Sequence, residues 1–154
     1  MPIPPPRSCV DGSVSFNGED IASVGVRYKG SVGAFLGCTS GPNPFDASGA
    51  KTCRKLSMKL KINWDGSDRE FYGVRKVQLH SQNLDQTKMH ERLGYWLFRE
   101  AGVPAPRSTQ ARVMINGEYL GLFALTEQMQ RVKVQHVDLV RDMTIVDVRF
   151  RLNS

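Results

Sequence analysis

The stretch "KLSMKLKI", residues 55–62, alternates strictly between polar and apolar side chains. Successive side chains of a β-strand point to opposite faces of its sheet, so this alternation predicts a half-buried strand. The buried face of the strand would consist of Leu56, Met58, Leu60 and Ile62. Its solvent face would carry Lys59 and Lys61, with Lys55 at the start of the strand. The stretch therefore predicts a sheet with one apolar face and one basic face.

A second stretch, "VGVRYKGS" (residues 24–31), alternates in the same way, with two cations on one face and Tyr28 on the other. If both strands belong to one sheet, their cations share a face. This basic face would comprise Arg27, Lys29, Lys59 and Lys61, extended by Lys76 and His80 from a third strand. Like charges on neighbouring strands repel one another unless an anion lies among them. A nucleotide triphosphate with its metal is such an anion, because phosphate binds to convergent arginine and lysine donors.

The same pattern also fits an ordinary solvated face, because sheets commonly carry lysines on the side that faces water. The alternation alone leaves both interpretations open. Nucleic-acid binding is disfavoured, because the aromatic side chains do not interleave with the basic ones as they do in RNA-binding sheets. His80, His90 and His136 are isolated in the sequence and are expected to be surface or structurally satisfied histidines.

Two Asn-Gly pairs predict β-hairpins, because this dipeptide favours a tight type I′ turn. Asn17-Gly18 joins strands expected at 13–16 and 19–29. Asn116-Gly117 joins two further strands near the end of the pattern. Between these hairpins lie a long loop at 30–52 and a strand at 74–81.

The apolar period changes to that of a helix over 86–101, after Asp85 as a predicted N-cap. One helix face would carry Met89, Leu93, Trp96, Leu97 and Ala101. We expect this face to cover the apolar side of the sheet, so that Trp96 and Leu97 are buried. The predicted fold class is α+β: an antiparallel sheet with one main helix packed on it.

The chain has 154 residues and a formal net charge of +6, which permits an acidic partner. Residues 51–80 hold eight lysines and arginines against three acids, so most of the net charge lies in one fifth of the chain. No apolar run reaches the length of a membrane span. Cys38 and Cys53 bracket a turn-rich loop and could form a disulfide, which would leave Cys9 unpaired.

The two ends of the chain differ from its middle. Residues 1–12 are proline-rich and are interpreted as a linker. Residues 129–154 lack glycine and proline and are interpreted as a tail of uncertain structure. Within this tail, "TIVDVRFRL" could form a strand with one apolar face. That face would carry Val146, Val148, Phe150 and Leu152.

Four stretches, in order and spacing, resemble the CotH family of spore-coat-type atypical protein kinases. They are "VGVRYKGS", "KLSMKLKI", "FYGVRKVQLHSQNLDQTKMHERLGYWLFREAGVPAPR" and "ARVMINGEYLGLFALTEQM". The resemblance covers about residues 20–130 and departs from the family pattern at Leu56 and His90. It corresponds to the N-terminal portion of the family, so the sheet and helix are expected to resemble the N-terminal lobe of a kinase at residues 13–128.

This resemblance implies binding of ATP and Mg²⁺ and transfer of a phosphoryl group to serine or threonine of a protein substrate. Arg27, Lys29, Lys59 and Lys61 would face the phosphates. Glu91 would pair with one of these cations from the helix, as kinases pair a lysine with a helical glutamate. Glu127 would lie near the segment that binds adenine.

The family's catalytic and metal-binding aspartates have no recognisable counterpart in this sequence. Asp138, Asp142 and Asp147 follow the matched stretches but sit in no catalytic motif. The chain is therefore expected to be an N-terminal kinase fragment that is inactive alone, located at the cell surface or outside the cell. The alternatives are a non-enzymatic surface or coat-binding module and, less favoured, a basic nucleic-acid-binding domain.

Overall fold

The fold contains two β-hairpins, one near each end of the described chain, and both have the predicted Asn-Gly turns. The computed structural model describes residues 9–30, 38–42, 51–128 and 145–152. Asn17 and Gly18 have φ angles of 47° and 91°, and Asn116 and Gly117 have φ angles of 49° and 86°. Positive φ at both central residues is the requirement of a type I′ turn. The two hairpin predictions are therefore confirmed.

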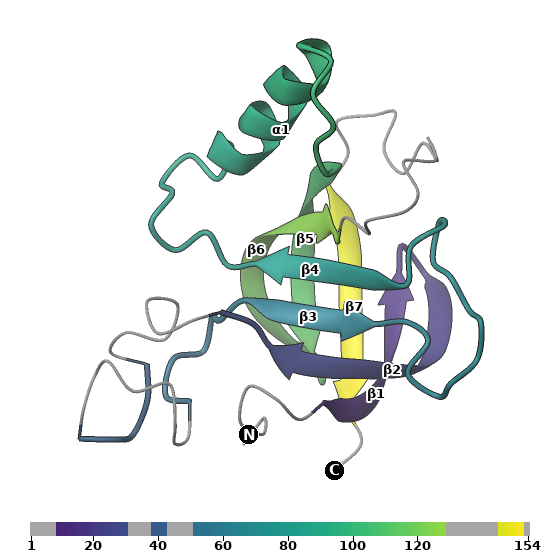
Figure 1. The fold of residues 1–154 in the computed structure, drawn as a ribbon. Coiled ribbons are helices and arrows are strands. Elements are labelled where there is room, and N and C mark those ends of the chain that lie inside the picture. The colour runs from purple at the N-terminus through teal and green to yellow at the C-terminus, as the bar shows by residue number, and fades with distance from the viewer. Residues whose placement is uncertain (1–8, 31–37, 43–50, 129–144, 153–154) are drawn as a thin grey trace.

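The described residues form seven strands that close into a barrel (Figure 1). The strands are β1 (Val10–Phe16), β2 (Glu19–Tyr28), β3 (Met58–Lys61), β4 (Lys76–His80), β5 (Ser108–Ile115), β6 (Glu118–Glu127) and β7 (Val146–Leu152). Their order around the barrel is β1-β2-β3-β4-β6-β5-β7. Neighbouring strands are antiparallel except β5 and β7, which are parallel.

Strand β7 closes the barrel by pairing with β1 on one side and β5 on the other. Phe150 lies opposite Val14 of β1 and Ile115 of β5. Val148 and Phe150 are buried, whereas Arg149 between them is exposed. The strand suggested by the alternation of "TIVDVRFRL" is therefore present and belongs to the barrel wall.

The interior of the barrel is filled by apolar side chains from its own strands. In β3 and its flanks, all four apolar residues of the opening stretch point inward and are at most 2% exposed. The largest fully buried side chains are Phe123, Phe150, Leu56, Met58, Leu60, Ile62, Leu79, Val14, Val24, Val26 and Val113. Strand alternation therefore determines which side chains form the core, as predicted.

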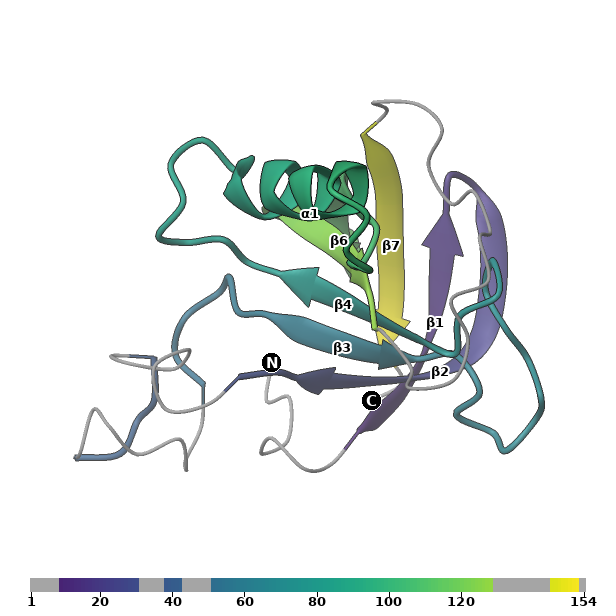
Figure 2. The same ribbon diagram turned by 45° about the horizontal axis from the view of Figure 1, so that its top comes forward.

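The predicted α+β class with a helix packed on the sheet is wrong. Helix α1 (His90–Glu100) has no buried residue, and Trp96 and Leu97 are 52% and 62% exposed. Figures 1 and 2 show α1 outside the barrel wall. The physical reason is closure: the apolar side of the sheet faces the barrel interior, where strand side chains already cover it. The sheet therefore leaves no apolar face for the helix to cover.

Helix α1 also begins later than predicted, and Asp85 is not its N-cap. The N-cap position is Met89, which makes no side-chain capping bond. The Asp85 carboxylate instead accepts hydrogen bonds from the backbone N–H groups of Thr87 (3.0 Å) and His90 (3.0 Å). Asp85 therefore organises the turn that leads into the helix.

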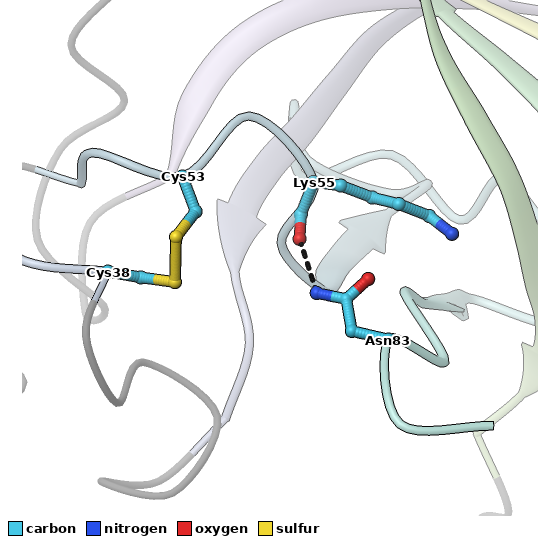
Figure 3. Close-up of a disulfide and its surroundings, with 4 residues drawn as sticks. All are labelled: Cys38, Cys53, Lys55 and Asn83. Carbon is cyan, nitrogen blue, oxygen red and sulfur yellow. Dashed lines mark hydrogen bonds between the residues drawn. A yellow bond between two sulfur atoms is a disulfide. The ribbon is translucent and has the colours of Figure 1, made fainter. Parts of the chain in front are cut away.

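A disulfide joins Cys38 to Cys53, with Cα atoms 4.9 Å apart (Figure 3). The predicted pairing is therefore confirmed, and Cys9 is free. Figure 3 also shows Lys55 just beyond the disulfide, where its backbone carbonyl accepts a hydrogen bond of 2.9 Å from the Asn83 amide. The disulfide thus lies close in sequence to the start of β3.

The exposed side of α1 leads to a stability prediction. We expect Trp96→Ser to lower the free energy of unfolding by less than about 1 kcal/mol, because half of this side chain is already in water. Leu79→Ala, which truncates a fully buried side chain, should cost about 2–5 kcal/mol. Urea unfolding of both variants measures the difference. Equal losses in the two variants would show that the helix is packed through Trp96.

Candidate functional site: a basic face and a helix-linked histidine

The outer surface of β2, β3 and β4 carries a group of cations. Arg27 of β2 lies opposite Lys59 of β3, and Lys61 of β3 lies opposite Lys76 of β4. Their sequence neighbours Val26 and Leu60 point into the barrel. We call Arg27, Lys29, Lys59, Lys61 and Lys76 the basic face. The predicted grouping of cations on one side of the sheet is therefore what the strand register produces.

Electrostatic repulsion is concentrated at Lys59. Partial burial lowers the pKa of its ammonium group, and the neighbouring charges of Arg27, Lys76 and Lys29 lower that pKa further. Cys9 acts weakly in the opposite direction. Three cations thus act on Lys59 together, which is an arrangement that a bound anion would stabilise.

Lys61 differs from the other cations because it lies beside an aromatic ring. Its ammonium nitrogen is 5.5 Å from the centre of the Trp64 ring, within the range of a cation–π interaction. Trp64 itself packs closely over Gly25, where a Cβ atom would lie 2.6 Å from the indole. Gly25 therefore permits the tryptophan to cover this end of the face.

Lys29 is linked to the helix through a histidine. Its ammonium group contacts Nε2 of His80, and Nδ1 of the same ring contacts Oε1 of Glu91 on α1. A lysine ammonium can only donate, so Nε2 accepts and the ring proton lies on Nδ1, where it is donated to Glu91. We call this chain of contacts the histidine link. It runs from Lys29, just after β2, through His80 of β4 to Glu91 of the helix.

Glu91 is the most heavily hydrogen-bonded acid of this region. Besides His80, its Oε1 accepts from the hydroxyls of Tyr95 (3.2 Å) and Thr126 (3.3 Å). Burial opposes its negative charge, yet these hydrogen bonds hold the pKa of the carboxyl group below its ordinary value. For Lys29, burial lowers the pKa of the ammonium group, and the charge of Glu91 acts in the opposite direction. Glu91 therefore stays ionised and its charge acts on Lys29.

Glu127 lies apart from the basic face. Its Oε2 accepts hydrogen bonds from Nε (2.9 Å) and Nη2 (2.7 Å) of Arg107. Both residues line a pocket at one mouth of the barrel, together with aromatic side chains that include Phe16 and Phe71. The strand register thus places Arg27, Lys59 and Lys61 on one face, His80 connects Lys29 to Glu91, and Glu127 stays outside that group.

One feature of the site differs from the expectations above. The cations were expected to project away from the helix, but the helix stands on the same outer side of the wall, because the interior is full. His80 is a structurally satisfied histidine, as expected, and its two partners are Lys29 and Glu91. The signal that could have found it is its place on the outer face of β4, two residues beyond Gln78, which lies opposite Lys59.

The described residues contain no group of three histidine, cysteine, aspartate or glutamate side chains that could hold a metal ion. No helix among the described segments is long and apolar enough to cross a membrane.

Comparison with known proteins adds two findings. The family model described as CotH kinase protein matches residues 26–151, which includes most of β7. A protein of Bacillus subtilis (strain 168), described as an inner spore coat protein H-like protein, is 31% identical over 70 residues. That similarity covers 46% of this chain and 22% of the relative. The chain thus matches less than a quarter of the relative's length.

Proposed function

Because the chain belongs to the CotH kinase protein family, we propose that its basic face binds the phosphates of ATP as part of a protein kinase. The observation that carries this proposal is the repulsion at Lys59, where Arg27, Lys76 and Lys29 all act on one ammonium group. Phosphate oxygens would replace this repulsion by charge-assisted hydrogen bonds.

The histidine link supports the same proposal. Kinases pair a strand lysine with a helical glutamate beside the phosphate site. Here Glu91 of α1 acts on Lys29, the residue that follows β2, through His80. The connection fixes the helix to the barrel at the edge of the basic face.

The described residues offer suitable partners for the phosphates of ATP but not for Mg²⁺. The cations of the basic face fit the phosphates, which supply the hydrogen-bond acceptors that these donors require. Mg²⁺ prefers carboxylate, phosphate and water oxygens, and the described residues offer no cluster of carboxylates for it. The proposed phosphate contacts are those of the cations of the basic face.

We further propose that the described residues bind phosphate without carrying out its transfer. Among the aspartates considered above, Asp147 is paired with Arg112, at 2.7 Å between Oδ1 and Nε, on β7 and β5. Asp138 and Asp142 lie outside the described residues. Transfer of the phosphoryl group to a serine or threonine of a protein substrate is proposed only for the whole kinase.

The proposed setting is a coat or cell surface, outside the reducing cytosol. The Cys38–Cys53 disulfide supports this setting, because disulfides persist mainly in oxidising environments. The description of the Bacillus subtilis relative as a spore coat protein-like protein agrees with it. A non-enzymatic coat-binding module would share this setting but would not require the basic face to bind nucleotide.

The nucleotide proposal predicts a specific loss of affinity. Lys59→Ala and Arg27→Ala should each weaken ATP binding by about tenfold, the effect expected from removing one charged phosphate contact. Arg149→Ala, which removes an exposed cation from β7 across the barrel, is the matched control. Calorimetric titration of the 154-residue chain with ATP, at low and at raised salt, measures the change.

Binding through surface cations should also weaken as salt is raised, because counterions screen the charges. If all three variants bind ATP as tightly as the unaltered chain does, the phosphates do not lie on the basic face. If the unaltered chain does not bind ATP at either salt concentration, the proposal for this chain is wrong.

A further inference from the structure

We infer that His80 is a positioning residue that binds the Lys29 ammonium group while its ring is neutral and releases it to a phosphate on the basic face when the ring gains a proton. This inference rests on the proposed phosphate-binding function and adds its regulation by pH. It is drawn from the contacts of one imidazole with groups on three different elements.

The neutral ring can hold both neighbours at once. Lys29 donates to Nε2, and Nδ1 donates to Glu91. The side chains of His80 and Glu91 are only 20% and 18% exposed, so water competes weakly for these contacts. In this state the Lys29 ammonium group is committed to the histidine.

A second proton on the ring removes the acceptor that Lys29 uses. Nε2 then carries a hydrogen and can only donate, so two cations face each other at that contact. Nδ1 keeps its bond to Glu91, and the attraction between the two charges strengthens it. Protonation therefore retains the helix contact and breaks the lysine contact.

The groups around His80 determine where the released lysine goes. The ring contacts Lys29, which follows β2, Glu91 of α1, and Gln78 of its own strand. The Tyr95 hydroxyl of α1 donates to the same Glu91 carboxylate. From β6, Thr126 bonds the same carboxylate oxygen and brings no charge. Glu91 is thus the single carboxylate in this described group, and the histidine already uses it. Lys29 already lies close enough to affect the charge of Lys59, so a phosphate bound at Lys59 is near the released ammonium group.

A phosphate bound on the basic face would gain from this release. Lys29 adds a donor to those of Lys59 and Arg27, and the phosphate offsets the added repulsion. Affinity for ATP should therefore rise when the ring gains its second proton, by about tenfold for one added charged contact.

The test compares three forms of the 154-residue chain by ATP titration between pH 5.5 and 8. In His80→Gln, the glutamine can accept from Lys29 and donate to Glu91 but cannot gain a proton. It should lose the rise of affinity at low pH. His90→Gln, which alters an exposed histidine bonded to Asp85, should keep the rise. Because ATP itself titrates in this range, the quantity compared is the ratio between variants at each pH.

A second measurement needs no nucleotide. In the unaltered chain, nitrogen NMR signals of the Lys29 ammonium group and the His80 ring should shift with one common midpoint. An unchanged Lys29 signal across the histidine titration, or the same rise of affinity in His80→Gln, would overturn the inference. A common midpoint without ATP binding at any pH would support the release of Lys29 and overturn the phosphate proposal instead.

Discussion

Phe150→Ala is expected to lower the free energy of unfolding by about 3–5 kcal/mol, the usual cost of truncating a buried phenylalanine. Phe150 is 1% exposed and lies in β7 between β1 and β5. Its removal leaves a cavity where two far ends of the described chain meet. Chemical denaturation followed by circular dichroism measures the loss.

Arg149→Ala serves as the control, because it changes the adjacent residue of the same strand but an exposed side chain. It should alter the free energy of unfolding by no more than about 0.5 kcal/mol. If the two substitutions have equally small effects, β7 is not part of the barrel in solution, and the sheet is open between β1 and β5.

Removal of the Cys38–Cys53 disulfide is expected to cost about 3 kcal/mol in the chain-entropy model for a loop of this length. Without the disulfide, the loop has more conformational entropy in the unfolded chain, and this stabilises the unfolded state. Both cysteines pack against the edge of the core, so the double substitution to serine also loses some apolar contact. Urea unfolding under non-reducing conditions compares it with the unaltered chain.

Cys9→Ser is the matched control, because Cys9 is a free cysteine. It should leave the urea midpoint nearly unchanged. A reducing agent should destabilise the unaltered chain by about as much as the double substitution does, and should have no effect on the double variant. A double variant as stable as the unaltered chain would show that the disulfide does not form in solution.

Local patterns predicted the strands well. The alternation at residues 55–62 identified the buried side of β3, and both Asn-Gly pairs identified hairpin turns. These features depend on a few neighbouring residues, whose side-chain period and φ angles are nearly independent of the rest of the fold. The same alternation predicted that Arg27 and Lys59 share a face.

The packing of α1 could not be predicted in the same way. An apolar stripe such as Leu93, Trp96 and Leu97 indicates that one face of a helix can pack against another element. It does not identify that element. Whether a sheet face remains available depends on the closure of the barrel, which is decided by β7 and β1. These strands are far apart in the sequence, so no short window contains the information.

The histidine link was missed for a related reason. Lys29, His80 and Glu91 come from three separate elements, and each is unremarkable beside its sequence neighbours. Only the register of β2, β3 and β4 and the position of α1 bring them together. Glu91 was predicted to pair directly with a cation, whereas its carboxylate contacts His80, which in turn contacts Lys29.

The pairing of β1 with β7 also has a consequence for the order of folding. The backbone N–H of Asp147 donates to the side chain of Asn17 across 130 positions of sequence. Contacts of such separation form slowly, because the entropy of a long loop must be lost before they contribute. During synthesis the first hairpin can form early, but one edge of β1 stays open until β7 has left the ribosome. An open strand edge can pair with other chains, so this interval is when the protein is most prone to aggregate.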